Sequence, residues 1–145
     1  MTRRRPPAGE DRGSVTLELA VLTPALILLL GLVALAGRVE VAASAVEHAA
    51  ATGARAASLA RTVDAAQTAA TEAVGRELDA QGLHCGTSTV TVEVAGLTAP
   101  LGDPATVTVT TSCTVTMSDL AVPGLPGSRT LTGEATSAVD RYRTR

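Results

Sequence analysis

The sequence predicts an α+β protein, with a long N-terminal transmembrane helix that continues outside the membrane and a small antiparallel β-rich domain after it. The run from Leu19 to Gly37 contains no charged residue and consists mainly of Leu, Val, Ile and Ala. About 17–25 mostly apolar residues suffice to cross a bilayer, and lipid forces such a run into a helix. An Ala-rich stretch then keeps the helical period. From residue 83 onward Thr and Val alternate, which is typical of strands.

These changes in composition divide the 145 residues into four parts. We expect a basic cytoplasmic leader at 1–13, a transmembrane helix at 14–37, an extracytoplasmic helical region at 38–82 and a β-rich domain at 83–145. Four Arg residues precede the apolar run, and only two follow it within about twenty residues. By the positive-inside rule, the chain is then a single-pass protein of the cell membrane with its N-terminus in the cytoplasm.

A cleaved secretory signal peptide is the competing interpretation of the apolar run. The residues before Gly37 read Ala34-Leu35-Ala36, a small-x-small pattern at which signal peptidase cuts. However, the run is longer than the usual 7–15 residue core of a signal peptide, and the helical pattern continues past it. We therefore favour a retained anchor, with a secreted protein cleaved near Ala36 as the alternative. Pro24, near the start of the run, predicts a helix kink.

The segment 38–61 contains no Pro and is rich in Ala, so it favours helix strongly. Its small apolar residues recur at intervals of three and four, while Glu40, Glu47 and Arg55 fall on other faces. The predicted apolar face comprises Val39, Ala42 or Ala43, Val46, Ala50, Gly53 or Ala54, and Ala57. Gly53 is a potential weak point of this helix.

A second helix is expected over 62–82, unless the first helix simply continues. Asp64 is a plausible N-cap because Gln67 follows three residues later, as in a capping box. Gly82 suits the C-terminal end. The apolar stripe of this helix is expected to comprise Ala65, Ala69, Ala73 and Leu78.

Three strands are expected in the C-terminal part. Residues 89–94 alternate at period two, and so does 106–110, which continues into 114–117. The segment 129–139 is a third, weaker strand. Gly and Pro in 95–104 indicate a hairpin loop, and Pro123-Gly124-Leu125-Pro126-Gly127 indicates a turn.

The chain has two cysteines, Cys85 and Cys113, and both follow the apolar run. Outside the cytoplasm an even number of cysteines indicates a disulfide, whereas in a reducing compartment they would be two free thiols. We favour the disulfide. It would close a loop of nearly thirty residues and contribute roughly 3–4 kcal/mol. This matters because the chain has no Phe or Trp and a single Tyr, so its core is thin.

Composition argues against two classes of function. The net charge of −2 and the near absence of aromatic residues argue against nucleic-acid binding. The only histidines are His48 and His84, too few for a metal site with three or four ligands, and Glu47-His48 is interpreted as a solvated helix face. Neither a catalytic set nor a phosphate loop is visible, so we expect no enzyme, no cofactor and no metal.

The boundary between leader and apolar run carries the functional signal. Gly13 is followed by Ser14, and Glu18 stands at the inner edge of the apolar run. This spacing resembles a class III, type IV-like prepilin signal. In that family the prepilin peptidase cuts after the Gly, so Ser14 would become the new N-terminus. Because a charge in lipid costs several kcal/mol unless it is paired, Glu18 would pair with the α-amino group of a neighbouring helix and set its register. The alternative places Glu18 in the headgroup region without a role.

The wider sequence R-G-S-V-T-L-E-L-A-V-L-T-P-A-L-I-L-L-L-G resembles the N-terminus of the TadE-like family, pseudopilins of tight-adherence (Flp, type IVb-like) pilus assembly systems. Gly13, Glu18 and Pro24 carry the resemblance, and Leu19 departs from the Tyr or Phe that often follows the Glu. The resemblance implies a pilin-like fold and a minor pilin or pseudopilin in pilus assembly. It also implies as partners other pilins and pseudopilins, the tight-adherence inner-membrane platform, prepilin peptidase and membrane lipid. The other interpretation is an unprocessed, membrane-anchored extracellular binding or scaffold protein.

Overall fold

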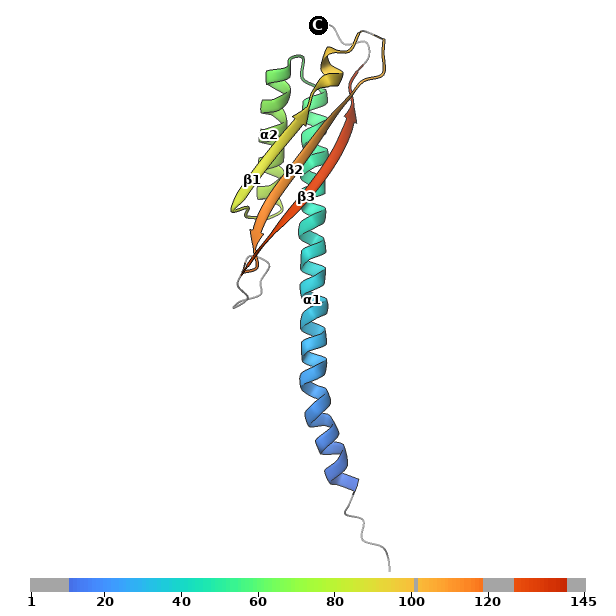
Figure 1. Ribbon diagram of the computed structural model, residues 1–145, viewed down its shortest axis with the longest axis vertical. Coiled ribbons are helices and arrows are strands. Elements are labelled where there is room, and N and C mark those ends of the chain that lie inside the picture. The colour runs from blue at the N-terminus through green and yellow to red at the C-terminus, as the bar shows by residue number, and fades with distance from the viewer. Residues whose placement is uncertain (1–10, 101, 119–126, 141–145) are drawn as a thin grey trace, which may run out of the picture. The chain divides into compact units, whose positions relative to one another are not determined.

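The computed structural model describes residues 11–100, 102–118 and 127–140, with side chains from residue 16 onward. Within these ranges the chain forms two α-helices, a short 3-10 helix and a three-stranded sheet, in the order α1, α2, β1, η1, β2, β3 (Figure 1). The chain divides into two compact units, the first ending at Gly37 and the second beginning at Arg38. The expected α+β class is confirmed.

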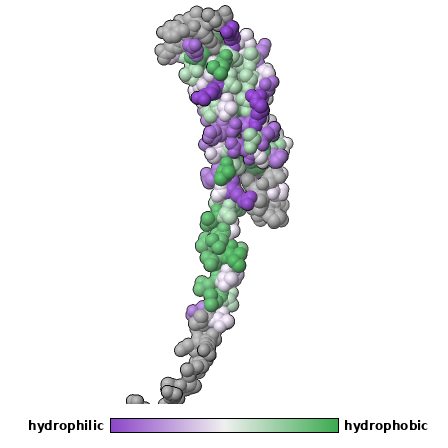
Figure 2. Space-filling view, turned by 180° about the vertical axis from the view of Figure 1, so that it is seen from behind, coloured by the Kyte–Doolittle hydropathy of each residue, from purple (hydrophilic) through white to green (hydrophobic). Residues whose placement is uncertain are grey.

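Helix α1 spans Asp11–Ser58 and contains Pro24. Between Thr16 and Gly37 nearly every described side chain is exposed, because no other element of the first unit covers it. Figure 2 shows the hydrophobic surface that these side chains form. Over the described residues, one helix is long and apolar enough to cross a membrane, by its length and composition. The helix is continuous through Pro24, and the kink stays a prediction.

The part of α1 in the second unit packs through the small-residue face that the sequence predicts. Val46, Ala50, Ala54 and Ala57 are all buried. The helix ends at Ser58, three residues earlier than expected. It does not break at Gly53, where a Cβ atom would lie 2.7 Å from Val74 Cγ2. Gly53 therefore lets the second helix approach closely, and this explains a glycine in a helix interior.

Helix α2 spans Val63–Ala80, so the second helix is separate. Its N-cap is Thr62, whose backbone is extended and whose Oγ1 accepts a hydrogen bond from the Ala65 N–H at 3.2 Å. The prediction of Asp64 as N-cap is wrong: Asp64 already lies in the first helical turn, where its carboxylate instead faces the positive end of the helix dipole.

The predicted apolar stripe of α2 is partly wrong. Ala65 is exposed and Ala69 is half-buried, although Ala73 and Leu78 are buried as expected. Val74 and Leu78 turn to the core together because they lie four residues apart on the helix. The buried face then runs through Ala66, Ala70, Ala73, Val74 and Leu78.

Helix α2 ends as the sequence predicts. Gly82 has a φ of 67°, a left-handed conformation that favours glycine. The Leu83 N–H donates to the Leu78 carbonyl at 3.0 Å, and the Gly82 N–H donates to the Asp79 carbonyl at 3.0 Å. These two bonds form a Schellman motif, which turns the chain toward the sheet.

The sheet has the order β1-β2-β3 and is antiparallel throughout. Its strands are Thr87–Glu93, Thr106–Thr116 and Ser128–Ala138, close to the predicted bounds. The 3-10 helix η1 (Ala95–Thr98) lies in the expected hairpin loop. The predicted turn at 123–127 falls mainly outside the described residues. In the second unit both helices lie on one face of the sheet (Figure 1).

The two faces of the sheet differ in composition because the strands alternate. On the inner face, β2 contributes the buried residues Val107, Val109, Thr111, Cys113 and Val115. On the outer face, Thr and Ser from all three strands stand side by side. Hydroxyls pair across strands there, as between Thr108 and Thr136 at 3.0 Å and between Thr114 and Thr130 at 2.9 Å.

Two close contacts compensate for a core without large aromatic side chains. Cys85 and Cys113 form the expected disulfide, which joins the segment before β1 to the central strand β2. At Gly133, β3 comes so near α1 that a Cβ atom would lie 2.7 Å from the Glu47 nitrogen. The core is therefore built from backbone approach as well as side-chain burial.

Candidate functional site: the apolar helix and the edge grooves

Among the side chains that the structure describes in the first unit, from Thr16 to Gly37, Glu18 is the one acidic group. It is exposed on α1, five residues after Gly13. Gly13 and Ser14 belong to the same helix, of which the structure describes only the backbone at these positions, and cleavage between them stays a prediction. Glu18 thus stands at the start of a continuous apolar surface.

The side chains of that apolar surface are exposed and favour burial in an apolar environment. Leu22, Leu28 and Leu32 are 62%, 75% and 63% exposed, and their neighbours on α1 are similar. Along this helix a shallow groove of about 500 Å³ is lined by Leu19, Leu22, Thr23, Ala25, Leu26 and Leu29. At roughly 25 cal/mol per Å², so much exposed apolar surface favours lipid or another helix strongly over water. This segment is therefore suited to a membrane or to helix–helix packing.

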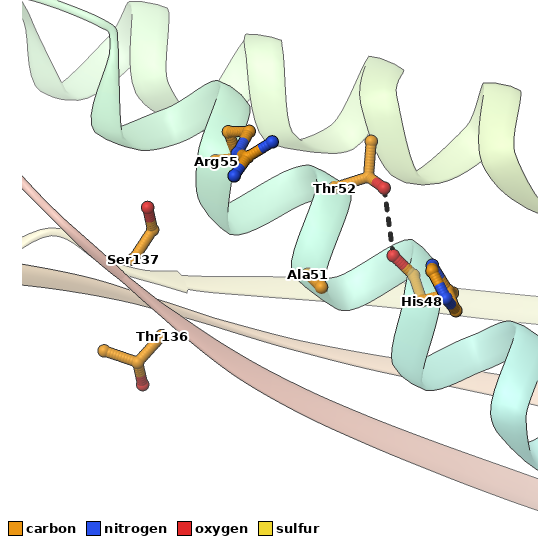
Figure 3. A pocket seen from close by; sticks show the side chains of 6 residues that line it. All are labelled: His48, Ala51, Thr52, Arg55, Thr136 and Ser137. Atoms are coloured by element: carbon orange, nitrogen blue, oxygen red, sulfur yellow. Dashed lines mark hydrogen bonds between the residues drawn. The ribbon is translucent and has the colours of Figure 1, made fainter.

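In the second unit, a groove of about 440 Å³ lies between α1 and the end of β3 (Figure 3). His48, Ala51, Thr52 and Arg55 line it from α1, and Thr136 and Ser137 line it from β3. The Thr52 Oγ1 donates to the His48 carbonyl at 3.0 Å, so its hydroxyl is occupied within its own helix.

Ser137 ties the two walls of this groove together. Its Oγ donates to the Ser58 Oγ at 3.1 Å, and the Ser58 Oγ donates to the Arg55 carbonyl at 2.9 Å. The last turn of α1 is thereby fixed against β3, with His48 and Arg55 left exposed. The exposure of His48 is consistent with the sequence interpretation of a solvated helix face. The sequence did not indicate the groove, because the β3 residues that line it lie almost ninety positions further along the chain.

A second groove, of about 290 Å³, lies between α2 and the start of β1. It is lined by Gly75, Leu78, Asp79, Leu83, His84, Cys85 and Ser88. His84 lies in this groove next to Cys85, which belongs to the disulfide. Among the residues that the structure describes, no group of three His, Cys, Asp or Glu side chains is close enough to hold a metal ion.

The comparisons with known proteins agree with the N-terminal signal. No curated protein and no solved structure matches the chain. A family model described as TadE-like protein matches residues 13–55, which include Gly13, Glu18, Pro24 and most of α1. Through residues 13–55, the chain is similar to TadE-like proteins.

Proposed function

We propose that the protein is a minor pilin or pseudopilin, a membrane-anchored structural component in the assembly of a tight-adherence pilus. The observation that carries this proposal is the family match over 13–55, which begins at Gly13 and contains the apolar helix. Other pilins, the inner-membrane assembly platform and prepilin peptidase are then its partners. The apolar part of α1 anchors the chain in the cell membrane, with the leader in the cytoplasm and the second unit outside.

The chemistry of the helix start supports processing and assembly. Cleavage after Gly13 leaves an ammonium group on Ser14 at the membrane edge, one turn before Glu18. In lipid each of these charges is costly alone, so a carboxylate on one helix and an ammonium on its neighbour stabilise the pair. The exposed apolar side chains that follow then pack against the neighbouring helix in a defined register.

The disulfide is consistent with an outer location of the second unit. A bond between Cys85 and Cys113 persists where the surroundings are oxidising, and it is rare in the cytoplasm. A pilus subunit outside the cell meets this condition. The bond staples a domain whose core has few large side chains.

The intact mass and the N-terminal sequence of the mature protein test the proposal. We expect the mature chain to start at Ser14, and a prepilin peptidase knockout to restore the start at Met1. A start at Met1 in normal cells would indicate an unprocessed anchored scaffold. A start near Gly37 would indicate a secreted protein cleaved after Ala36. Either of these results contradicts the proposed function.

A further inference from the structure

The two grooves of the second unit lie at opposite edges of its sheet. The sheet order is β1-β2-β3, so β1 and β3 are the two outer strands. One groove is formed by α1 and β3, and the other by α2 and β1. Figure 1 shows β1 and β3 at the two edges of the sheet. Copies of the chain placed side by side in one direction would bring the α1 edge of one against the α2 edge of the next.

The helices at these edges carry basic side chains on one and acidic side chains on the other, at equal spacing. His48 and Arg55 are exposed on α1, seven residues apart, and Glu72 and Asp79 are exposed on α2, also seven apart. Seven residues are nearly two helical turns, so each pair shares one face. We call His48, Thr52 and Arg55 the basic ridge, and Glu72, Gly75 and Asp79 the acidic ridge.

The two ridges match when their helices run in opposite directions. Read backward, the basic ridge steps by three and then by four residues, from Arg55 to Thr52 to His48. The acidic ridge, read forward from Glu72, steps by three and then by four as well. Antiparallel docking therefore sets Arg55 opposite Glu72 and His48 opposite Asp79, with the small residues Thr52 and Gly75 facing each other. Side-chain spacings of three and four residues are those through which packed helices interlock.

No contact among the described residues of the chain explains the glycine at position 75. It lies in the interior of α2, where glycine costs stability relative to alanine. A Cβ atom at Gly75 would meet nothing within 4 Å, whereas Cβ atoms at Gly53 and Gly133 would meet neighbours at 2.7 Å. A helix of another molecule that approaches closely at Gly75 would explain why this position is a glycine.

Leu59 adds an apolar contact to the same register. It is 80% exposed, directly after the end of α1 and one turn beyond Arg55. The antiparallel register brings it opposite Thr68, which is exposed on the first half of α2. A large apolar side chain at the end of the ridge would then be covered.

We propose that the basic ridge of one copy docks on the acidic ridge of a second copy of this chain. Within one chain α1 and α2 are adjacent and antiparallel, since Gly53 faces Val74 and a short turn joins them. An antiparallel contact between α1 of one copy and α2 of the next therefore keeps both copies pointing the same way. Such a head-to-tail contact uses two different surfaces, so it repeats and forms a ring or an open filament. The inference names a partner surface for the proposed function and rests on it for its setting, a fibre of aligned subunits.

The charges select the register more than they supply affinity. Glu72 also lies 3.6 Å from Arg76 of its own helix, with both side chains more than 60% exposed. Exposed ion pairs of this kind are weak, so Glu72 can exchange partners. Complementary charges across an interface mainly exclude other partners and other registers. The close approach at Gly75 and the cover of Leu59 then provide the contact area.

A cysteine cross-link tests the contact in membranes of cells that produce the full-length chain. With Thr52→Cys and Gly75→Cys combined, a mild oxidant should produce a ladder of dimers, trimers and larger species on a non-reducing gel. Either variant alone should produce no ladder. In the matched control, Gln67→Cys replaces Gly75→Cys, because Gln67 is exposed on the same helix about two turns away. Monomers alone, or a single dimer band, would overturn the proposal.

Charge reversal separates this contact from non-specific collision. Added to the cross-linking pair, Arg55→Glu should lower the yield by about fivefold, the effect of one exposed ion pair at its upper limit. Glu72→Arg in the same chain should restore it. A yield unchanged by Arg55→Glu would contradict the proposed register. A mature start at Ser14 without a ladder overturns this contact alone, and a ladder in a chain that keeps Met1 overturns the processing alone.

Discussion

Glu18 is the residue on which the proposed assembly mechanism depends. It is exposed at the start of the apolar surface of α1, and we propose that it pairs with an ammonium group of a neighbouring helix. Glu18→Gln keeps the shape and removes the charge, so membrane insertion should persist while pilus assembly falls sharply. Electron microscopy of surface pili and membrane fractionation measure the two effects. Glu40→Gln, at another exposed acid of α1, is the matched control and should assemble normally. Normal pili with Glu18→Gln would sink the pairing mechanism.

Thr111 is a second residue with a measurable consequence. Its side chain is fully buried on the inner face of β2, and its Oγ1 has no hydrogen-bond partner among the residues that the structure describes. A buried polar group without a partner costs about 1–3 kcal/mol, so Thr111→Val should raise the free energy of unfolding by about 1 kcal/mol. Chemical denaturation of the full-length protein in detergent measures this change.

The neighbouring position provides the control for that substitution. The Thr110 Oγ1 lies on the outer face and donates to Glu134 at 3.4 Å. Thr110→Val should therefore leave stability nearly unchanged or lower it slightly. If Thr111→Val instead lowers the free energy of unfolding by as much as an ordinary core substitution, the Thr111 hydroxyl makes a stabilising contact and this prediction is wrong.

The packing of β3 on α1 rests on a glycine. A Cβ atom at Gly133 would lie 2.7–2.8 Å from backbone atoms of Glu47 and Val46, which cannot move without shifting the helix. Gly133→Ala should therefore lower the free energy of unfolding by about 1–3 kcal/mol, as overpacking does. Gly75→Ala, in open space on α2, should raise it by about 0.5–1 kcal/mol. Equal effects of the two substitutions in thermal unfolding would contradict this account.

The helices and strands differ in how well the sequence alone predicts them. The apolar run, the small-residue face of α1 and the alternating strands were predictable because each depends on a period within one segment. The start of α2 was not, since Thr62 and Asp64 are both good capping residues and only the backbone conformation separates them. The face of α2 depends on where its partners lie. The close approach at Gly133 joins segments some ninety residues apart, and no local pattern indicates it.

The candidate site likewise has parts that a local sequence pattern predicts and parts that it does not. Gly13 and Glu18 were found from the sequence because a short linear motif contains both. The groove between α1 and β3 was not, since it combines a helix with a strand that is distant in the chain. The equal spacing of His48 and Arg55 with Glu72 and Asp79 was present in the sequence, but it gained meaning only when all four residues proved to be exposed.

At the scale of the whole molecule, the disulfide compensates for a core of small side chains. Cys85 and Cys113 are separated by 28 positions, and a loop of this size corresponds to about 3–4 kcal/mol by chain entropy. Replacing both cysteines with alanine should lower the free energy of unfolding by that amount. Denaturation with and without a reducing agent measures it. A reducing agent should change the midpoint of the native chain and leave the double variant unaffected.

The same bond also sets how far the chain stretches under load. A surface fibre that holds a cell in flow carries tension along its subunits. Between Cys85 and Cys113 the covalent path crosses the sulfur bridge, so the segment between them bears no force even when the domain unravels. At about 3.3–3.6 Å per extended residue, this withholds roughly 90–100 Å of contour length from each subunit. A fibre that contained this protein would thus lengthen less before its extension reached a limit.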